Sequence, residues 1–159
     1  MKQCPCGSNL SYSLCCSPYI NGQDTPKTPE ALMRSRYTAY TLAETGYIKK
    51  TMQGKAAIGF NEKEAKDWAQ LMYWLGLNLI KTMPHTTDKS IGYVEFVAKY
   101  LDKNFIRIIH EISEFQHVDG IWFYTDGQQI ENKAQPIGRN AVCPCGNQRK
   151  FKNCHGIGY

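Results

Sequence analysis

The stretch that organises this chain lies near its end and reads Cys143-Pro144-Cys145-Gly146-Asn147-Gln148-Arg149-Lys150-Phe151-Lys152-Asn153-Cys154-His155. A second copy opens the chain, as Cys4-Pro5-Cys6-Gly7-Ser8-Asn9-Leu10-Ser11-Tyr12-Ser13-Leu14-Cys15-Cys16. In each copy, two cysteines separated by a proline are followed, after eight intervening residues, by an adjacent pair of ligands. The two sets use all seven cysteines of the chain and one histidine. The two ends of the chain are therefore predicted to be metal sites.

These ligand sets are typical of zinc, which structural sites hold in a tetrahedron of four cysteines or of three cysteines and a histidine. We assign one ion to the first set and one to the second, giving two ions per chain with the ligands Cys4, Cys6, Cys15 and Cys16, and Cys143, Cys145, Cys154 and His155. Another metal that prefers sulfur ligands could bind the same residues in place of zinc. A disulfide scaffold is disfavoured because the adjacent Cys15 and Cys16 have poor geometry for a bond and nothing in the sequence indicates secretion. The ions must supply most of the folding free energy of such short loops.

Charge is distributed unevenly along the chain. Residues 1–131 carry fourteen basic and fourteen acidic side chains, whereas residues 132–159 carry five basic and no acidic ones. Arg149, Lys150 and Lys152 surround Phe151, and this cluster favours a protein partner with an acidic surface. Nucleic-acid binding is disfavoured because a single aromatic residue among the basic ones offers no series of stacking platforms.

The apolar segments are short. The longest, residues 71–80, is too short to span a bilayer, and the first residues have no apolar segment behind them that would form a signal peptide. Together with the reduced cysteines that a metal site needs, this predicts a cytoplasmic protein without a membrane span.

The middle of the chain first shows helical periodicity and then strand periodicity. We expect a helix from an N-cap at Thr28 to about residue 45, a short turn of helix over 47–52, and a helix from Asn61 up to Gly76. Tyr37, Tyr40 and Trp68 on these helices are expected to be core residues. Strands are expected over 77–83, 91–101, 105–117 and 121–130. Helices followed by an antiparallel meander predict an α+β fold, with the helices packed on one face of a curved sheet.

The hairpin between the second and third strands sets which side chains face the helices. A three-residue loop over 102–104 would align two apolar sets on one face, namely Val94, Phe96, Ala98 and Tyr100 with Ile106, Ile108, His110 and Ile112. This register is expected because a shift of one residue would break up the apolar face.

Both cysteine stretches resemble the SEC-C motif, the zinc-binding knuckle that ends the translocation ATPase SecA. The whole chain resembles the YchJ-like (UPF0225) family, through residues 31–40 (Ala-Leu-Met-Arg-Ser-Arg-Tyr-Thr-Ala-Tyr), 110–115 (His-Glu-Ile-Ser-Glu-Phe) and 120–127 (Gly-Ile-Trp-Phe-Tyr-Thr-Asp-Gly). The resemblance implies a middle domain similar to nuclear transport factor 2, over residues 28–131, between knuckles at 1–17 and 138–159. By likeness to the SecA tail, it also implies that the basic second knuckle docks on an acidic chaperone such as SecB. The first knuckle departs from the pattern at Leu10-Ser11, where basic residues are usual, and the second has Asn147 in place of the usual serine.

Chemistry in the middle domain is only weakly indicated. Two strands that should pair carry a polar patch ringed by aromatic side chains, and we take as candidate pocket residues His110, Glu111, Ser113, Phe115, Trp122 and Tyr124. His110 is better explained as a hydrogen-bonded histidine of the sheet than as a catalytic base. No activated nucleophile and no cofactor fingerprint is present, so no catalytic residue is assigned. The sequence predicts a non-enzymatic zinc-binding adaptor; the alternative is small-molecule binding or isomerase-like activity in a cavity of the middle domain.

Overall fold

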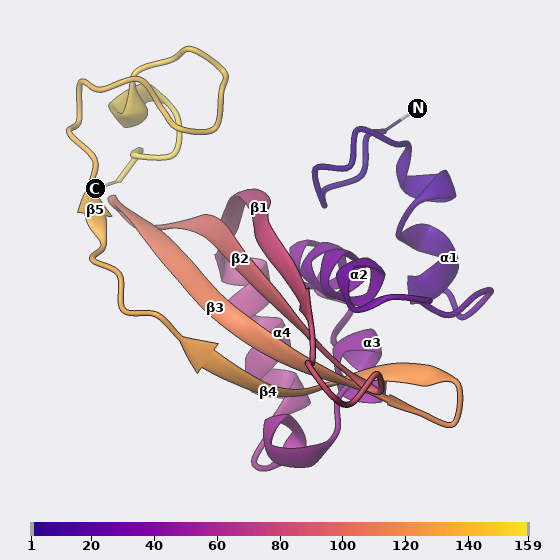
Figure 1. Ribbon diagram of the computed structural model, residues 1–159. Helices are drawn as coiled ribbons and strands as arrows, with labels where there is room; N and C mark the ends of the chain where they lie inside the picture. The colour runs from indigo at the N-terminus through magenta and orange to yellow at the C-terminus, as the bar shows by residue number, and fades with distance from the viewer. Residues whose placement is uncertain (1, 159) are drawn as a thin grey trace.

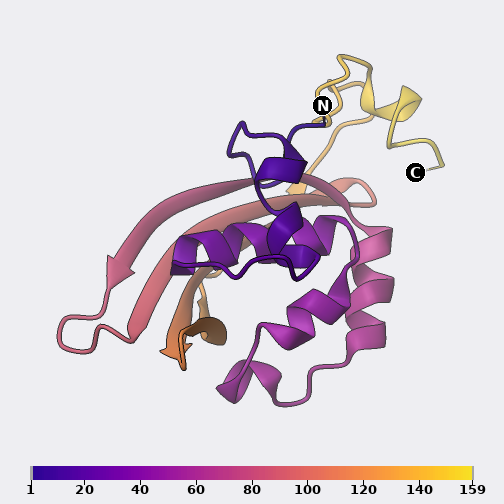
Figure 2. The same ribbon diagram turned by 90° about the vertical axis from the view of Figure 1, so that its right-hand side faces the viewer.

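The computed structural model describes residues 2–158 as a curved antiparallel sheet whose concave face is covered by helices (Figures 1 and 2). The strands follow the order β1-β2-β3-β4, and a short strand, β5, pairs with the start of β3. The helices are α1 (Ser17–Ile20), α2 (Pro29–Thr41), α3 (Thr45–Lys50) and α4 (Glu62–Leu71), and the strands are β1 (Tyr73–Pro84), β2 (Ile91–Asp102), β3 (Phe105–Val118), β4 (Ile121–Gln129) and β5 (Gln135–Pro136). Single 3₁₀ turns lie at Tyr12–Leu14, Gly54–Ala57 and Phe151–Asn153. The predicted α+β class is confirmed.

The start of α2 follows the predicted capping chemistry. Thr28 accepts a hydrogen bond through Oγ1 from the backbone N–H of Ala31 at 3.1 Å, and Pro29 occupies the first helical position, where a missing N–H costs nothing. The helix ends at Thr41, earlier than expected, because the chain turns through Ala43 with a φ of 56°. A separate helix, α3, then begins at Thr45.

The predicted end of the last helix was wrong. Helix α4 stops at Leu71 and strand β1 already begins at Tyr73. Tyr73 pairs with Leu101 and Trp74 with Tyr100, so pairing with β2 overrides the apolar spacing that suggested a longer helix. Trp74 is thereby brought beneath α2 and α4, with its ring 5.5 Å from that of Tyr37 and 5.3 Å from that of Trp68.

The predicted register of the central hairpin was also wrong, by one residue. Asp102 pairs with Phe105, so the turn has two residues, and Lys103 takes a φ of 55° there. Phe96 consequently pairs with Glu111, which places a carboxylate on the inner face of the sheet. His110 lies on the opposite face, where Nε2 is 2.8 Å from Glu95 Oε1.

The two cysteine clusters lie at the same end of the sheet, on either side of the start of β1 (Figures 1 and 2). The N-terminal cluster is part of the main core, which contains Cys4, Cys6, Cys16, Leu32, Met33, Tyr37, Val94, Phe96, Ala98 and Phe115. The C-terminal cluster has a separate small core, in which Cys143 and Phe151 pack on Leu101. The ring of His155 also lies 4.0 Å from that of Tyr73.

Within residues 2–158, none of the helices has both the length and the apolar character needed to cross a membrane.

The different packing of the two ends predicts different effects of deleting them. Deletion of residues 139–159 should leave a cooperative unfolding transition, because it uncovers little of the main core. Deletion of residues 1–16 should lower the free energy of unfolding by about 3 kcal/mol or more, because it strips Tyr37 and Leu32 of buried neighbours. Urea denaturation of the two truncated proteins measures the difference, and equal losses would contradict it.

Candidate functional site

The N-terminal cluster brings four sulfur atoms together. The sulfurs of Cys4, Cys6, Cys15 and Cys16 all lie within 4.8 Å of one another. Cys6 Sγ is 3.6 Å from Cys15 Sγ, which in turn is 3.8 Å from Cys16 Sγ. A tetrahedral zinc ion with zinc–sulfur bonds of about 2.3 Å would separate its sulfurs by about 3.8 Å. The donor set and its spacing therefore fit zinc.

The C-terminal cluster repeats this arrangement with one nitrogen ligand. The three sulfurs and a ring nitrogen of His155 lie within 4.8 Å of one another. Cys145 Sγ is 3.6 Å from Cys154 Sγ, and His155 Nδ1 is 3.1 Å from Cys154 Sγ and 3.3 Å from Cys143 Sγ. This set also fits a tetrahedral site of three cysteines and a histidine.

The backbone of the two clusters is repeated as well. Gly7 and Gly146 have φ values of 74° and 86°, a backbone conformation that glycine adopts without strain. A backbone hydrogen bond of 2.8 Å closes each loop, from Cys4 N to Leu10 O and from Cys143 N to Arg149 O.

One side chain in each loop supports the third ligand. Ser8 Oγ lies 3.2 Å from Cys15 Sγ, and Asn147 Nδ2 donates to Cys154 Sγ at 2.9 Å. Ser8 and Asn147 occupy matching positions, so the asparagine takes over the contact that the usual serine makes. Such contacts orient a metal ligand and balance its charge.

The electrostatics of the N-terminal cluster favour a cation. A hydrogen bond from Cys16 lowers the pKa of Cys6 to about 4, and this hydrogen bond together with burial raises the pKa of Cys16. A thiolate is thus stabilised beside thiols that share their protons with it. A divalent metal would displace those protons, because it binds the thiolate form.

The basic residues of the C-terminal knuckle differ in exposure. Arg149 and Lys150 are exposed and Lys152 is half-buried. Phe151 is only 1 % exposed, because it fills the small core against Leu101. Its side chain therefore anchors the knuckle and offers no surface to a partner.

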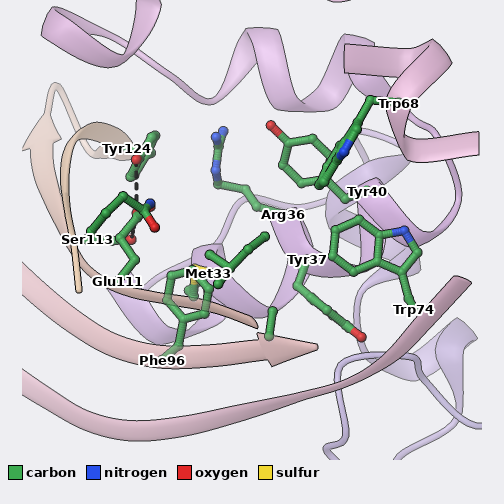
Figure 3. Close-up of a pocket in the computed structure, with 13 residues that line it drawn as sticks. Met33, Arg36, Tyr37, Tyr40, Trp68, Trp74, Phe96, Glu111, Ser113 and Tyr124 are labelled. Carbon is green, nitrogen blue, oxygen red and sulfur yellow. Dashed lines mark hydrogen bonds between the residues drawn. The ribbon is translucent and has the colours of Figure 1, made fainter. Parts of the chain in front are cut away.

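A cavity of about 230 Å³ lies between the sheet and helices α2 and α4 (Figure 3). Aromatic side chains form one end of it, and polar side chains form the other. It is lined by Met33, Arg36, Tyr37, Tyr40, Trp68, Trp74, Phe96, Ala98, Ile109, Glu111, Ser113, Tyr124 and Gln129. Gln129 is exposed, so the cavity reaches the surface near the end of β4.

Glu111 is the acceptor on which the polar end is built. Ser113 Oγ donates to its Oε1 at 2.5 Å and Tyr124 donates to the same oxygen at 2.9 Å, while Gln129 Nε2 donates to Oε2. Burial raises the pKa of Tyr124, and the neighbouring carboxylate raises it further, so the phenol stays protonated and remains a donor. Three donors compensate the carboxylate for its lost hydration.

Gly127 makes room for this carboxylate. A Cβ atom at Gly127 would lie 2.6 Å from Glu111 Cδ and would also overlap the Tyr124 hydroxyl. Strand β4 therefore leaves room for the hydrogen bonds of Glu111 because position 127 has no side chain.

Arg36 of α2 reaches the cavity from the helical side. Its Nη1 donates to the carbonyl oxygen of Ile48 at 2.8 Å and to Thr51 Oγ1 at 2.7 Å. Its guanidinium carbon lies 4.7 Å from the centre of the Tyr124 ring. The segment after α3 also pairs with β4, since Tyr124 N donates to Thr51 O at 2.9 Å. Arg36, α3 and Tyr124 are thus held as one unit.

The structure brings only part of the predicted pocket together. Glu111, Ser113 and Tyr124 line the cavity, whereas Phe115 is buried behind it in the core and His110 lies on the far face of the sheet. Trp122 stacks on His117 at 4.9 Å and donates to the carbonyl of Lys27, away from the cavity.

Sequence reasoning missed Arg36 and Gln129, and it treated Tyr37, Tyr40 and Trp68 only as core. Arg36 could have been found, because it shares the helical stripe of Met33, Tyr37 and Tyr40. Gln129 gave no signal of its own.

Comparison with known proteins gives matches over most of the chain. Residues 28–127 match the family model described as "YchJ, middle NTF2-like domain", and residues 139–157 match the SEC-C motif. The chain is 44% identical over 158 residues to a UPF0225 protein of Geobacter sulfurreducens, covering 96% of this chain and 97% of that protein. It is 41% identical over 155 residues to a UPF0225 protein of Serratia proteamaculans, with the same coverage of 96% and 97%.

Two solved structures are similar to this chain. One is the solution structure of a SEC-C motif containing protein from Rhodopseudomonas palustris, with a TM-score of 0.71 and 31% identity, covering 80% of this chain and 98% of that one. The other is the crystal structure of a SEC-C motif containing protein from Psychrobacter arcticus, with a TM-score of 0.69 and 28% identity, covering 98% of this chain and 96% of that one.

The space left by Gly127 gives a test of the polar network. Gly127→Ala should displace Glu111 and lower the free energy of unfolding by about 1–3 kcal/mol, because a buried carboxylate loses donors. Gly138→Ala is the matched control, since no atom lies within 4 Å of the added Cβ there. Chemical denaturation compares the two, and similar stabilities would show that the network does not depend on this glycine.

Proposed function

The chain belongs to the YchJ-like (UPF0225) family, and we propose that it is a zinc-binding, non-enzymatic adaptor whose C-terminal knuckle docks on an acidic protein surface. The observation that carries this proposal is the repeated cluster of four metal ligands. The first cluster is buried in the main core, whereas the second lies outside it on a loop with exposed basic side chains. The proposal treats residues 1–17 and 138–159 as zinc knuckles on a middle domain of residues 28–131, working in the cytoplasm.

The surroundings of the two knuckles support a division of labour. The N-terminal one is tied to α2, because Arg34 donates from Nη1 to the carbonyl of Cys6 at 2.9 Å. The C-terminal one carries Arg149 and Lys150 on an exposed loop. Exposed basic side chains on a compact loop attract an acidic partner at long range and orient it. We infer that the first knuckle is structural and that the second is the docking element.

The proposal predicts two zinc ions per chain. Elemental analysis of reduced protein purified without added metal should give close to two equivalents of zinc. Cys143→Ser/Cys145→Ser should remove one equivalent and leave the middle domain folded, because the second cluster lies outside the main core. Cys4→Ser/Cys6→Ser should remove the other equivalent and destabilise the whole protein. Less than one equivalent in the reduced wild-type protein after addition of zinc would overturn the assignment.

Docking is tested by reversing the basic charges. Arg149→Glu/Lys150→Glu/Lys152→Glu should weaken binding to an acidic chaperone such as SecB roughly tenfold at low salt, because exposed ion pairs contribute about 0.2–1 kcal/mol each. The difference should shrink at high salt, as screening shortens the range of the charges.

The matched control reverses the same number of charges elsewhere. Lys50→Glu/Lys66→Glu/Lys89→Glu changes three exposed lysines of the middle domain and should leave binding largely unchanged. Equal binding by wild type and the knuckle variant, or no binding to any acidic partner, would remove the docking role.

The cavity supports a second candidate function, small-molecule binding in the middle domain. The cavity of about 230 Å³ is lined by the buried guanidinium of Arg36 and the buried carboxylate of Glu111, and the exposed Gln129 lies at its rim. Concave apolar space with a few converging polar groups is the usual form of a ligand site. Isomerase-like chemistry would require Glu111 to act as a base, and its three donors disfavour that role.

A further inference from the structure

Arg36 is a buried cation without an ion-pair partner among the described residues. Its exposed fraction is 5 %, and the ion pairs found within residues 2–158 do not include it. Burial lowers its pKa, but a guanidinium still keeps its proton at neutral pH. Charged side chains are rarely buried unless they are paired. The buried positive charge therefore lowers the free energy of unfolding unless a partner compensates it.

The hydrogen bonds of Arg36 leave one edge of the guanidinium unused. Both bonds to Ile48 and Thr51 come from Nη1, and in the part of the chain that the structure describes neither Nε nor Nη2 has an acceptor. The parallel N–H groups of Nε and Nη2 match the two oxygens of a carboxylate. The two hydrogen bonds of Nη1 fix the plane of the guanidinium, and a carboxylate would have to lie in that plane.

A second donor lies on the same side. Figure 3 shows the hydroxyl end of Tyr40 directed toward Arg36, and this hydroxyl has no hydrogen bond to any described residue. The proximity of the two side chains is also seen in the pKa of Tyr40, which burial raises and Arg36 lowers. The guanidinium edge can only donate and the hydroxyl can donate as well, so a single acceptor group on a ligand would satisfy both.

Glu111 does not fill that role. The ring of Tyr124 stacks beneath the guanidinium at 4.7 Å, and its hydroxyl donates to the carboxylate, so the ring keeps the two charges apart. Glu111 also receives hydrogen bonds from Ser113 and Gln129, which compensate its charge without Arg36.

The walls on the other side of Arg36 set the shape of a ligand. Trp68 and Trp74 meet edge to face with ring centres 5.3 Å apart, and Tyr40 lies 6.0 Å from Trp68. Such surfaces suit a flat ring. A cavity of about 230 Å³ is below the usual range for drug-sized ligands, so the molecule must be small.

We propose that the cavity binds a small, flat monocarboxylate, with the carboxylate on the free edge of Arg36 and the hydroxyl of Tyr40, and the ring against Trp68 and Trp74. This assignment rests on the second candidate function, ligand binding in the middle domain.

Benzoate is the probe, and the three tryptophans are the reporters. Titration of the full-length, zinc-loaded protein should shift the indole N–H signals of Trp68 and Trp74 in a saturable way. The signal of Trp122, which lies outside the cavity, should stay in place. Benzoate should bind at least tenfold tighter than benzamide, benzylammonium or toluene, because only benzoate pairs with the guanidinium as an anion.

Two variants locate the carboxylate. Arg36→Gln should weaken benzoate binding tenfold or more, and Tyr40→Phe, which keeps the ring, should weaken it severalfold. Tyr93→Phe is the matched control for loss of a tyrosine hydroxyl, since Tyr93 lies on the outer face beside Glu114, and it should bind benzoate like wild type. Thermal unfolding checks each variant. If Arg36→Gln does not fold, Tyr40→Phe and the ligand series decide the question.

The four probes distinguish failure of the carboxylate site from failure of ligand binding in the cavity. Tightest binding by benzamide, benzylammonium or toluene at the Trp68 and Trp74 signals would overturn the carboxylate site but keep ligand binding in the cavity. Benzoate binding that neither variant weakens would also overturn the carboxylate site. No shift of either signal with any of the four probes would overturn both the carboxylate site and the second candidate function.

Discussion

Four sulfur atoms held within 4.8 Å of one another are the constraint on which the N-terminal half of this structure depends. Residues 2–16 have few apolar side chains, yet three of their cysteines lie in the same core as Leu32 and Tyr37 of α2. Buried thiolates at this spacing repel one another unless a cation lies between them. The buried hydroxyl of Thr38, 3.7 Å from Cys4 Sγ, continues the contact into the helix. The cysteine cluster is thus part of the core that positions α2.

The same motif has different surroundings at the other end. Around the first cluster, Tyr12 packs toward the main core and the loop carries Leu10 and Ser11. Around the second, Phe151 closes a small core of its own, and the loop carries Arg149 and Lys150 outward. Similar ligand clusters therefore lie in different packing and charge environments at the two ends. The start of β1 joins the two, since Leu77 lies beside Gly7 and Tyr73 beside His155.

Local signals in the sequence predicted local structure well. The N-cap at Thr28 and the two ligand clusters each depend on a few neighbouring residues. The α+β class followed from periodicity, and the family from short motifs.

The register of the hairpin and the inner cavity were harder to predict. Strand β3 carries apolar side chains on both faces, so Ile106, Ile108 and Ile112 suggested the wrong inner face. The turn gave little warning, because Lys103 takes a positive φ that sequence would assign to glycine or asparagine. The inward position of Glu111 also depends on donors from β4 and on the space at Gly127. These lie far from Glu111 in the sequence and come together only in the folded chain.

The cavity joins features that serve different purposes. Its aromatic end is made by α2, α4 and the start of β1, and of these α2 and β1 pack in one core with the N-terminal cluster. Its polar end is made by Arg36, Tyr124 and Glu111, which the segment after α3 ties to β4. Two buried charges separated by a tyrosine ring stabilise a fold less than apolar side chains of similar volume would. Packing alone therefore does not account for these charges: three donors compensate Glu111, whereas the proposed carboxylate ligand would pair with the free edge of Arg36.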